Sequence, residues 1–180
     1  MRSTLKWISG TSAVFLLTTL SFSRPAQANE TTFTCSTSQG TPTTVAQTSE
    51  DEVPIIRFNS SYFNDRGWSP ERRCQEVSAR FQRFHQAKQL RYITVGTMNR
   101  QRIVCVAESK TSGCLKDGLL FTLKPTSNAN ATLRQLFGIK DQAAGPLSES
   151  RGRAYIDINE LLSRRSNAAP RNATPKKSVW

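Results

Sequence analysis

The most regular hydrophobic pattern of this chain lies in residues 69–90. Within this segment, Cys74, Val77, Phe81 and Phe84 recur at spacings of three and four residues. This repeat places the four side chains on one face of an α-helix. We therefore predict a long amphipathic helix whose apolar face packs against a β-sheet.

The sequence also predicts where this helix begins. Ser69 can accept a hydrogen bond from a backbone N–H of the first turn. Pro70 suits the first helical position, where its missing N–H costs nothing. Glu71 places a negative charge at the positive end of the helix dipole. Together these residues predict a helix that begins at Pro70.

Shorter segments rich in β-branched and aromatic residues predict strands before and after the helix. We expect strands at residues 31–36, 53–60, 91–97, 102–108, 119–123 and 154–158. Only a short polar turn separates residues 91–97 from residues 102–108, so these two strands should form an antiparallel hairpin. Pro54 cannot donate a ladder hydrogen bond, which restricts its strand to a sheet edge or to a strand start. We interpret residues 38–52, 109–118 and 141–153 as turns and loops.

Two shorter helices complete the predicted elements. Asn128 can cap a helix at residues 129–137, and Gly138 would end it. Residues 159–165 can form one or two further helical turns. Because strands lie on both sides of one long helix, with hairpin-length connections, we predict an α+β fold. Its core would be a small antiparallel sheet packed on the long amphipathic helix.

The chain opens with the features of a secretory signal peptide. Arg2 and Lys6 precede an uncharged, mostly apolar run, and small residues follow this run up to Ala28. We predict cleavage between Ala28 and Asn29. An uncleaved membrane anchor is the alternative, although the run is short for a membrane span. Cleavage after residues 1–28 would leave a single domain at residues 29–165 and a disordered basic tail at residues 166–180. We therefore expect an exported protein, in the periplasm or peripheral on the outer face of a membrane.

Positive charge is distributed unevenly along the chain, whose formal net charge is +12. Residues 29–68 hold two basic and five acidic side chains, whereas residues 69–124 hold eleven and four and residues 125–180 hold nine and four. A positive field of this kind favours anionic partners. For an exported protein we expect an anionic membrane surface or an acidic envelope component, and no nucleic acid. Simple solubility is the alternative explanation of the charge.

The arginines of the long helix are the candidate binding residues. Arg72, Arg73, Arg80 and Arg83 should form a basic side that faces away from the apolar side. Each basic side chain near an anionic leaflet contributes about 1 kcal/mol of binding free energy. The four arginines could therefore hold the protein at such a surface reversibly.

Four cysteines, Cys35, Cys74, Cys105 and Cys114, predict two disulfides in an exported chain. Three pairings are possible, and the sequence alone does not choose among them. We prefer Cys35–Cys105 with Cys74–Cys114, which would join the first strand to a later strand and the helix to a loop. The stabilisation expected from loop length differs too little between pairings to decide.

The sequence offers little for catalysis or metal binding. No two cysteines have the Cys-x-x-Cys spacing, and the single histidine, His85, lies three turns beyond Cys74 on the same helix. A zinc site and a Cys–His nucleophile both lack their usual arrangement. The acidic residues 50–52 suit a solvated loop, and Asp157 and Glu160 suit helix capping. We predict no catalytic residue, no metal site, no cofactor and no enzymatic activity.

Several segments also occur in the order found in a known protein family. After the signal peptide these are Phe33-Thr34-Cys35, Pro54-Ile55-Ile56-Arg57-Phe58, Tyr62-Phe63, Trp68-Ser69-Pro70-Glu71-Arg72-Arg73-Cys74, Val77-Ser78-Ala79-Arg80-Phe81-Gln82, Asn99-Arg100-Gln101, Ile103-Val104-Cys105, Cys114 and Leu119-Leu120-Phe121-Thr122-Leu123. Over residues 33–137 this arrangement resembles the circadian oscillating protein family of cyanobacteria.

The resemblance implies an exported cyanobacterial protein. It also implies that some members are peripheral membrane proteins whose level follows a daily rhythm. It brings no catalytic motif and no cofactor, and only the four cysteines carry over as site residues. We therefore predict a non-enzymatic exported envelope protein that is held at an anionic surface through its basic helix. A periplasmic adaptor that binds a protein partner through residues 166–180 is the alternative.

Overall fold

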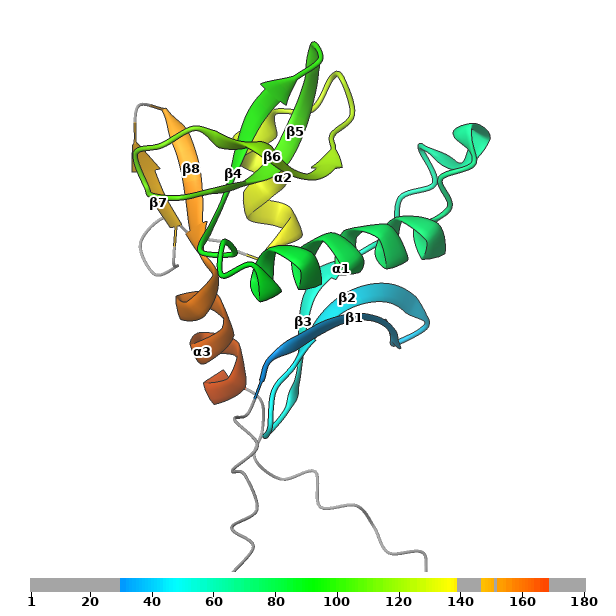
Figure 1. The fold of residues 1–180 in the computed structure, drawn as a ribbon. Coiled ribbons are helices and arrows are strands. Elements are labelled where there is room, and N and C mark those ends of the chain that lie inside the picture. Colours follow the sequence, from blue (N-terminus) through cyan, green and yellow to red (C-terminus); the bar gives the residue numbers. More distant parts are fainter. Residues whose placement is uncertain (1–29, 139–146, 151, 169–180) are drawn as a thin grey trace, which may run out of the picture.

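The computed structural model describes residues 30–138, 147–150 and 152–168, which form two sheets, three α-helices and one 3-10 helix (Figure 1). In chain order the elements are β1 (Thr32–Ser38), β2 (Thr41–Gln47), β3 (Glu52–Arg57), the 3-10 helix η1 (Asn64–Arg66), α1 (Pro70–Gln86), β4 (Tyr92–Met98), β5 (Gln101–Ala107), β6 (Cys114–Thr122), α2 (Ala129–Leu136), β7 (Leu147–Ser150), β8 (Arg153–Asp157) and α3 (Ile158–Ala168). All paired strands described here are antiparallel. The predicted α+β class is confirmed, but the strands are divided between two sheets instead of gathered in one.

The three-stranded sheet has the order β1-β2-β3, so β3 with its Pro54 is an edge strand, as predicted. Its central strand, β2, falls within residues 38–52, and the prediction of an exposed loop there is wrong. Thr43 and Thr44 of β2 are fully buried, and Thr44 Oγ1 lies 2.9 Å from Ser78 Oγ of α1. Threonine is β-branched and suits a strand. A search for apolar side chains misses β2 because hydroxyl groups fill part of its buried face.

Two hairpins of the fold use the same kind of tight turn. Gln39 and Gly40 between β1 and β2 have φ of 50° and 71°, and Asn99 and Arg100 between β4 and β5 have φ of 50° and 63°. Left-handed values at both central positions are typical of the type I′ turns that connect antiparallel strands. The predicted hairpin after the long helix is therefore confirmed.

The five-stranded sheet has the order β6-β5-β4-β8-β7. Because β6 begins at Cys114 and β7 lies at Leu147–Ser150, the loops predicted at residues 109–118 and 141–153 are each wrong in part. The register between β5 and β6 shifts at two places. Such irregularities interrupt the alternation of apolar and polar residues by which a strand is recognised.

The helix α1 lies between the two sheets (Figure 1). It begins as predicted, since Ser69 Oγ accepts the Arg72 N–H at 3.3 Å. The ring of Phe81 lies 5.5 Å from the ring of Phe33 on β1, and Gln82 Oε1 accepts the Phe33 backbone N–H at 2.7 Å. The prediction that a sheet packs on the apolar face of this helix is confirmed.

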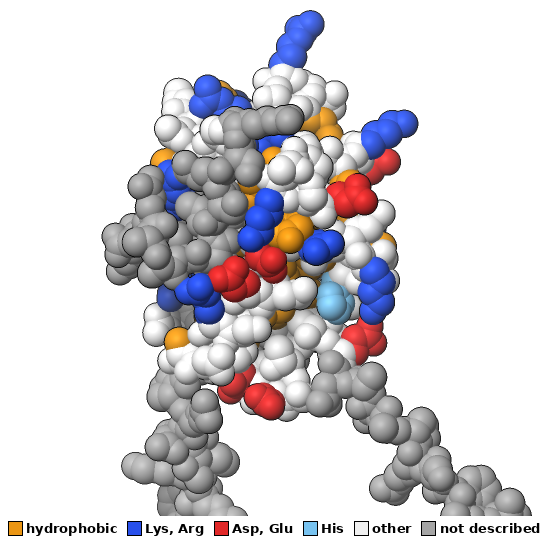
Figure 2. Space-filling model, turned by 90° about the vertical axis from the view of Figure 1, so that its left-hand side faces the viewer, with side chains coloured by type: hydrophobic (Ala, Val, Ile, Leu, Met, Phe, Trp, Pro, Cys, Tyr) orange, Lys and Arg blue, Asp and Glu red, His pale blue; other side chains and the backbone are white. Residues whose placement is uncertain are grey.

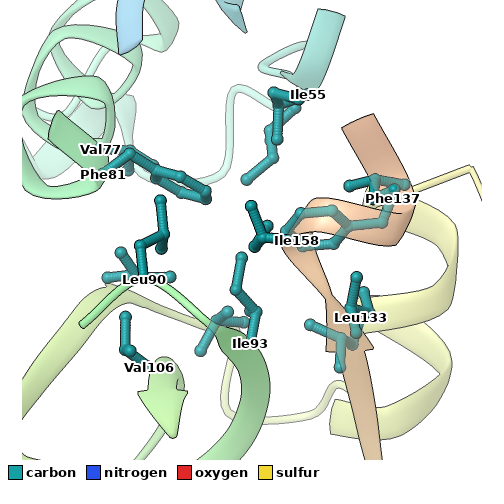
Figure 3. Packing of buried hydrophobic residues seen from close by; sticks show 14 of the residues in the cluster. Ile55, Val77, Phe81, Leu90, Ile93, Val106, Leu133, Phe137 and Ile158 are labelled. Atoms are coloured by element: carbon teal, nitrogen blue, oxygen red, sulfur yellow. The ribbon is translucent and has the colours of Figure 1, made fainter. Parts of the chain in front are cut away.

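Side chains from both sheets meet in one hydrophobic core. Figure 3 shows the following members pointing toward one another: Ile55, Val77, Phe81, Leu90, Ile93, Val106, Leu133, Phe137 and Ile158. They come from β3, α1, β4, β5, α2 with its C-cap residue, and the first residue of α3. Leu90 comes from the connection between α1 and β4. Full burial of one such side chain stabilises the fold by about 1.5–3 kcal/mol. The two sheets therefore belong to one packed unit.

The helices α2 and α3 begin at the expected capping residues. Asn128 Oδ1 accepts the Ala131 N–H at 3.0 Å. Asp157 Oδ1 accepts the backbone N–H groups two and three residues further on, at 3.1 and 3.2 Å. α3 continues to Ala168, three residues into the segment 166–180 that we predict to be a disordered tail. The remainder of that segment lies outside the described residues.

The structure corrects the predicted disulfide pairing. The bonds are Cys35–Cys74 and Cys105–Cys114, with Cα–Cα distances of 5.5 and 5.6 Å, so the preferred pairing of Cys35 with Cys105 and of Cys74 with Cys114 is wrong. Cys35 and Cys74 lie on β1 and on the face of α1 that packs against β1, whereas the other pair joins neighbouring strands of the five-stranded sheet. The preferred pairing joined the first strand to a later strand of a single predicted sheet, whereas the structure places β1 and β5 in different sheets.

Removal of the two disulfides should have unequal effects on stability. The Cys35–Cys74 bond spans 39 residues and the Cys105–Cys114 bond spans nine. Loop entropy therefore predicts a loss of about 4 kcal/mol for Cys35→Ala/Cys74→Ala and of about 2.7 kcal/mol for Cys105→Ala/Cys114→Ala. Urea unfolding of both double variants measures this difference. A larger loss for the second variant would contradict the expectation, and non-reducing peptide mapping verifies the pairing.

Gly96 of β4 should be required for the packing of the second disulfide. A Cβ atom built at Gly96 would overlap Cys114 Sγ, whereas one at Gly113 meets nothing closer than 3.5 Å. Overpacking of this kind costs about 1–3 kcal/mol. We expect Gly96→Ala to lower the free energy of unfolding by about that amount and Gly113→Ala to change it little. The loss should shrink when Gly96→Ala is combined with Cys105→Ala/Cys114→Ala, because the clashing sulfur is then absent.

Candidate functional site

The four arginines of the predicted binding face do not form one set in the structure. All four lie on α1, but the helix places them on different sides of its axis. Arg72 and Arg83 are exposed, whereas Arg73 and Arg80 are only partly exposed. The structure therefore divides the predicted face into two outer and two inner arginines.

The outer arginines, Arg72 and Arg83, each lie over an aromatic ring. The guanidinium carbon of Arg72 is 4.4 Å from the ring centre of Trp68, and that of Arg83 is 4.9 Å from the ring centre of Phe84. Arg72 Nη1 also donates to the Gly67 carbonyl at 3.0 Å. Stacking holds a guanidinium flat and leaves N–H groups at its edge for an anion.

The inner arginines, Arg73 and Arg80, hold α1 to other elements. Arg80 Nη1 donates to the Leu120 carbonyl of β6 at 2.8 Å. Arg73 Nη2 donates to the Ser60 carbonyl in the segment between β3 and η1. The prediction that all four arginines face outward is wrong for this pair, because Arg80 meets β6 and Arg73 meets the segment after β3. Whether any of the four binds an anionic surface stays a prediction.

Acidic side chains accompany the basic ones on the surface. Glu71 and Glu76 are exposed on α1 close to the outer arginines. On the face seen in Figure 2, basic and acidic side chains are interspersed and do not gather into patches of a single sign. This face therefore offers no uniformly positive patch to an anionic surface.

A cavity that the sequence analysis missed lies between β3, the first turns of α1, the end of β6 and α2. Its volume is about 680 Å³. Its cationic lining residues are Arg57, Arg73, Lys124 and Arg165, and no Asp or Glu lines it among the described residues. Its apolar lining includes Phe58, Phe63, Val77, Phe121 and Leu136. The available signal was three phenylalanines, of which Phe58 and Phe121 lie in predicted strands and Phe63 lies between a predicted strand and the helix, but only the fold brings them together.

Three arginines of the described residues line the cavity. Arg57 donates to Gln39 Oε1 at 3.0 Å, in the turn between β1 and β2. The other two, Arg165 and Arg73, are satisfied to different extents. Arg165 Nη1 donates to the carbonyls of Pro54 and Ile55, and its Nη2 donates to the carbonyl of Phe137. Arg73 makes its bond to Ser60, and its buried Nε has no hydrogen-bond partner in the described part of the chain. Burial lowers the pKa of both guanidinium groups, and Glu71 partly offsets this for the pKa of Arg73.

The remaining predictions concern the cysteines, the cleavage position, metal ligands and membrane-spanning helices. All four cysteines are in disulfides, and the predicted cleavage position at Ala28 and Asn29 lies outside the described residues. Within residues 30–138, 147–150 and 152–168, no group of three or more His, Cys, Asp or Glu side chains could hold a metal ion. The described helices include none that is long and apolar enough to cross a bilayer.

The comparison with protein families identifies this α+β domain with two internal disulfides. The family model described as Circadian oscillating protein COP23 matches residues 32–163, from the first residue of β1 into α3. The chain belongs to this family, and the resemblance found in the sequence is confirmed. Neither curated proteins nor solved structures give a significant match.

His85 should make the stability of the protein depend on pH. Its ring lies 5.4 Å from the ring of Phe33, and burial lowers its pKa from the usual 6.5, with Lys88 acting in the same direction and Glu30 opposing. The unfolded chain therefore binds the proton more readily. This contribution to stability is complete above about pH 6.5 and decreases as the pH falls through that value toward the lower folded pKa.

The free energy of unfolding should thus decrease more for the natural chain than for His85→Gln between about pH 7.5 and about pH 5.5. Urea titrations at several pH values measure both slopes. Equal slopes for the two proteins would show that His85 does not carry the effect.

Proposed function

We propose that this member of the family is an exported, non-enzymatic envelope protein that binds reversibly to an anionic surface through the outer arginines of α1. The observation that carries the proposal is the state of Arg72 and Arg83. Both are exposed, both are stacked on aromatic rings, and neither is in an ion pair among the described residues. Their charges are thus available to an external anion.

The charge of the surrounding sequence supports the same proposal. Residues 69–124, which include α1, hold eleven basic and four acidic side chains. A surplus of this size attracts an anionic surface over a distance of about 10 Å, which is the Debye length at moderate salt. The interaction would weaken as salt is added, so the protein would be peripheral and readily released.

An adaptor for a protein partner remains the second candidate. Its predicted contact segment, residues 166–180, is described only up to Ala168, where it forms the end of α3. The surface-binding proposal is favoured because Arg72 and Arg83 are exposed and lie over aromatic rings.

The double variant Arg72→Gln/Arg83→Gln tests the proposal without loss of the fold. Neither side chain is buried, and the inner arginines that hold α1 remain. At about 1 kcal/mol for each residue, the variant should partition about 30-fold more weakly onto vesicles containing phosphatidylglycerol. Co-sedimentation at low salt, followed by a titration with sodium chloride, measures this partition.

A control variant that removes the same number of positive charges elsewhere shows whether the position of the charges on α1 matters. Arg100→Gln/Lys116→Gln removes two exposed positive charges from the five-stranded sheet and should weaken vesicle binding much less. Arg72→Lys/Arg83→Lys should retain most of the binding, since the charge is kept. The proposal fails if both charge-removing variants lose binding equally, or if the natural chain does not bind the vesicles.

A further inference from the structure

We propose that the cavity between β3, α1, β6 and α2 binds an amphipathic anion. The anionic head, a carboxylate or phosphate, would lie between Arg73 and Lys124, and the apolar body would lie along the phenylalanines inside. This inference does not depend on surface binding by Arg72 and Arg83, because it rests on different residues.

The first argument is the uncompensated charge of Arg73. Its guanidinium is partly buried, and no carboxylate of the described residues forms an ion pair with it. Buried charges in proteins are normally paired. A guanidinium has five N–H donors, and Arg73 uses one side of its fork on the Ser60 carbonyl while its buried Nε has no partner. A bound anion would supply the missing counter-charge.

The second argument places the head at one end of the cavity. Arg165 already donates to three backbone carbonyls, so its N–H groups are largely occupied. Lys124 is different, because its Nζ lies 4.8 Å from the ring centre of Tyr62 and has no ion-pair partner in the described part of the chain. The head is therefore expected near Arg73 and Lys124 instead of near Arg165.

An aromatic pair connects these two cations. The rings of Tyr62 and Phe63 are 4.8 Å apart, edge to face. Lys124 lies over the first ring, and the guanidinium carbon of Arg73 is 5.4 Å from the centre of the second. Both cations thus border one aromatic pair in the segment before η1. Because both also line the cavity, an anionic head that enters here approaches both side chains.

The third argument concerns the body of the ligand. Beyond the cations, the lining includes Phe58, Val77, Phe121 and Leu136. These side chains offer no partner for a second charge, but they can remove apolar ligand surface from water. The volume of about 680 Å³ lies within the range of small-molecule sites. An ion without an apolar part would leave most of this lining uncovered.

Titration calorimetry with four probes tests the required chemistry on the full oxidised chain. Decanoate and decyl phosphate carry both an apolar body and an anionic head. Decanol has the body without the charge, and acetate has the charge without the body. We expect at least one of the two amphipathic anions to bind with a stoichiometry of one, and decanol and acetate to bind at least about tenfold more weakly. The stronger of the two anions identifies the head group.

Two matched variants test the position of the head. Lys124→Met removes a cavity cation, and Lys116→Met removes an exposed cation from the same region of the chain, outside the cavity. The first should weaken decanoate or decyl phosphate binding by about tenfold, since a charge-assisted contact is lost. The second should leave it unchanged, as should Arg72→Gln/Arg83→Gln. Arg73→Lys, which keeps the charge but not the planar fork, should also weaken binding.

Three results would overturn the inference. These are no saturable binding of either amphipathic anion, equal binding of decanol, and equal effects of Lys124→Met and Lys116→Met. If Arg73→Lys does not fold, as near-ultraviolet circular dichroism would show, the two lysine variants still decide. If the protein does not bind vesicles but still binds decanoate or decyl phosphate, the proposed function fails and the inference about the cavity stands.

Discussion

Burial of the apolar face of α1 is the constraint on which the rest of the structure depends. The helix lies between the two sheets, and its aromatic side chains contact β1 on one side while the core joins it to β4 and β5 on the other. Among the described helices, α1 with 17 residues is the longest, and α2 and α3 have eight and eleven. The Cys35–Cys74 bond then ties the helix covalently to the first strand. The fold is best described as one helix shared by two small sheets.

This arrangement explains which parts of the fold could be predicted from the sequence. The helix α1 has a strong apolar repeat and a complete set of start signals, so its first residue, its buried face and its contact with a sheet were all predictable. The hairpin of β4 and β5 has a short polar turn between two β-rich segments. These features are local, and local patterns are what a single sequence records most clearly.

Features that depend on neighbours in space were not predictable in the same way. Strand β2 buries both Thr43 and Thr44, and Thr44 lies against α1. The hydroxyl groups of this strand resemble those of an exposed segment. The disulfide pairing follows from which strand lies under α1, and cysteine spacing does not contain this information. The helical repeat gives the angular positions of Arg73 and Arg80 around the axis of α1. It does not reveal that β6 and the segment after β3 lie beside these positions and accept their hydrogen bonds. The cavity is lined by residues from several elements that lie far apart in the sequence, so no local pattern could predict it.

The position of Arg165 has a consequence for the order of folding. This residue of the last described helix donates to the carbonyl of Ile55 on β3, 110 positions earlier in the sequence. Contacts between distant residues form late, because the intervening chain must first be ordered. The edge of the three-stranded sheet therefore stays incomplete until nearly the whole domain has been synthesised. During synthesis or export from the N-terminus, the edge strand β3 would therefore stay uncovered until α3 has emerged. The docking of α3 would then complete the assembly of the domain.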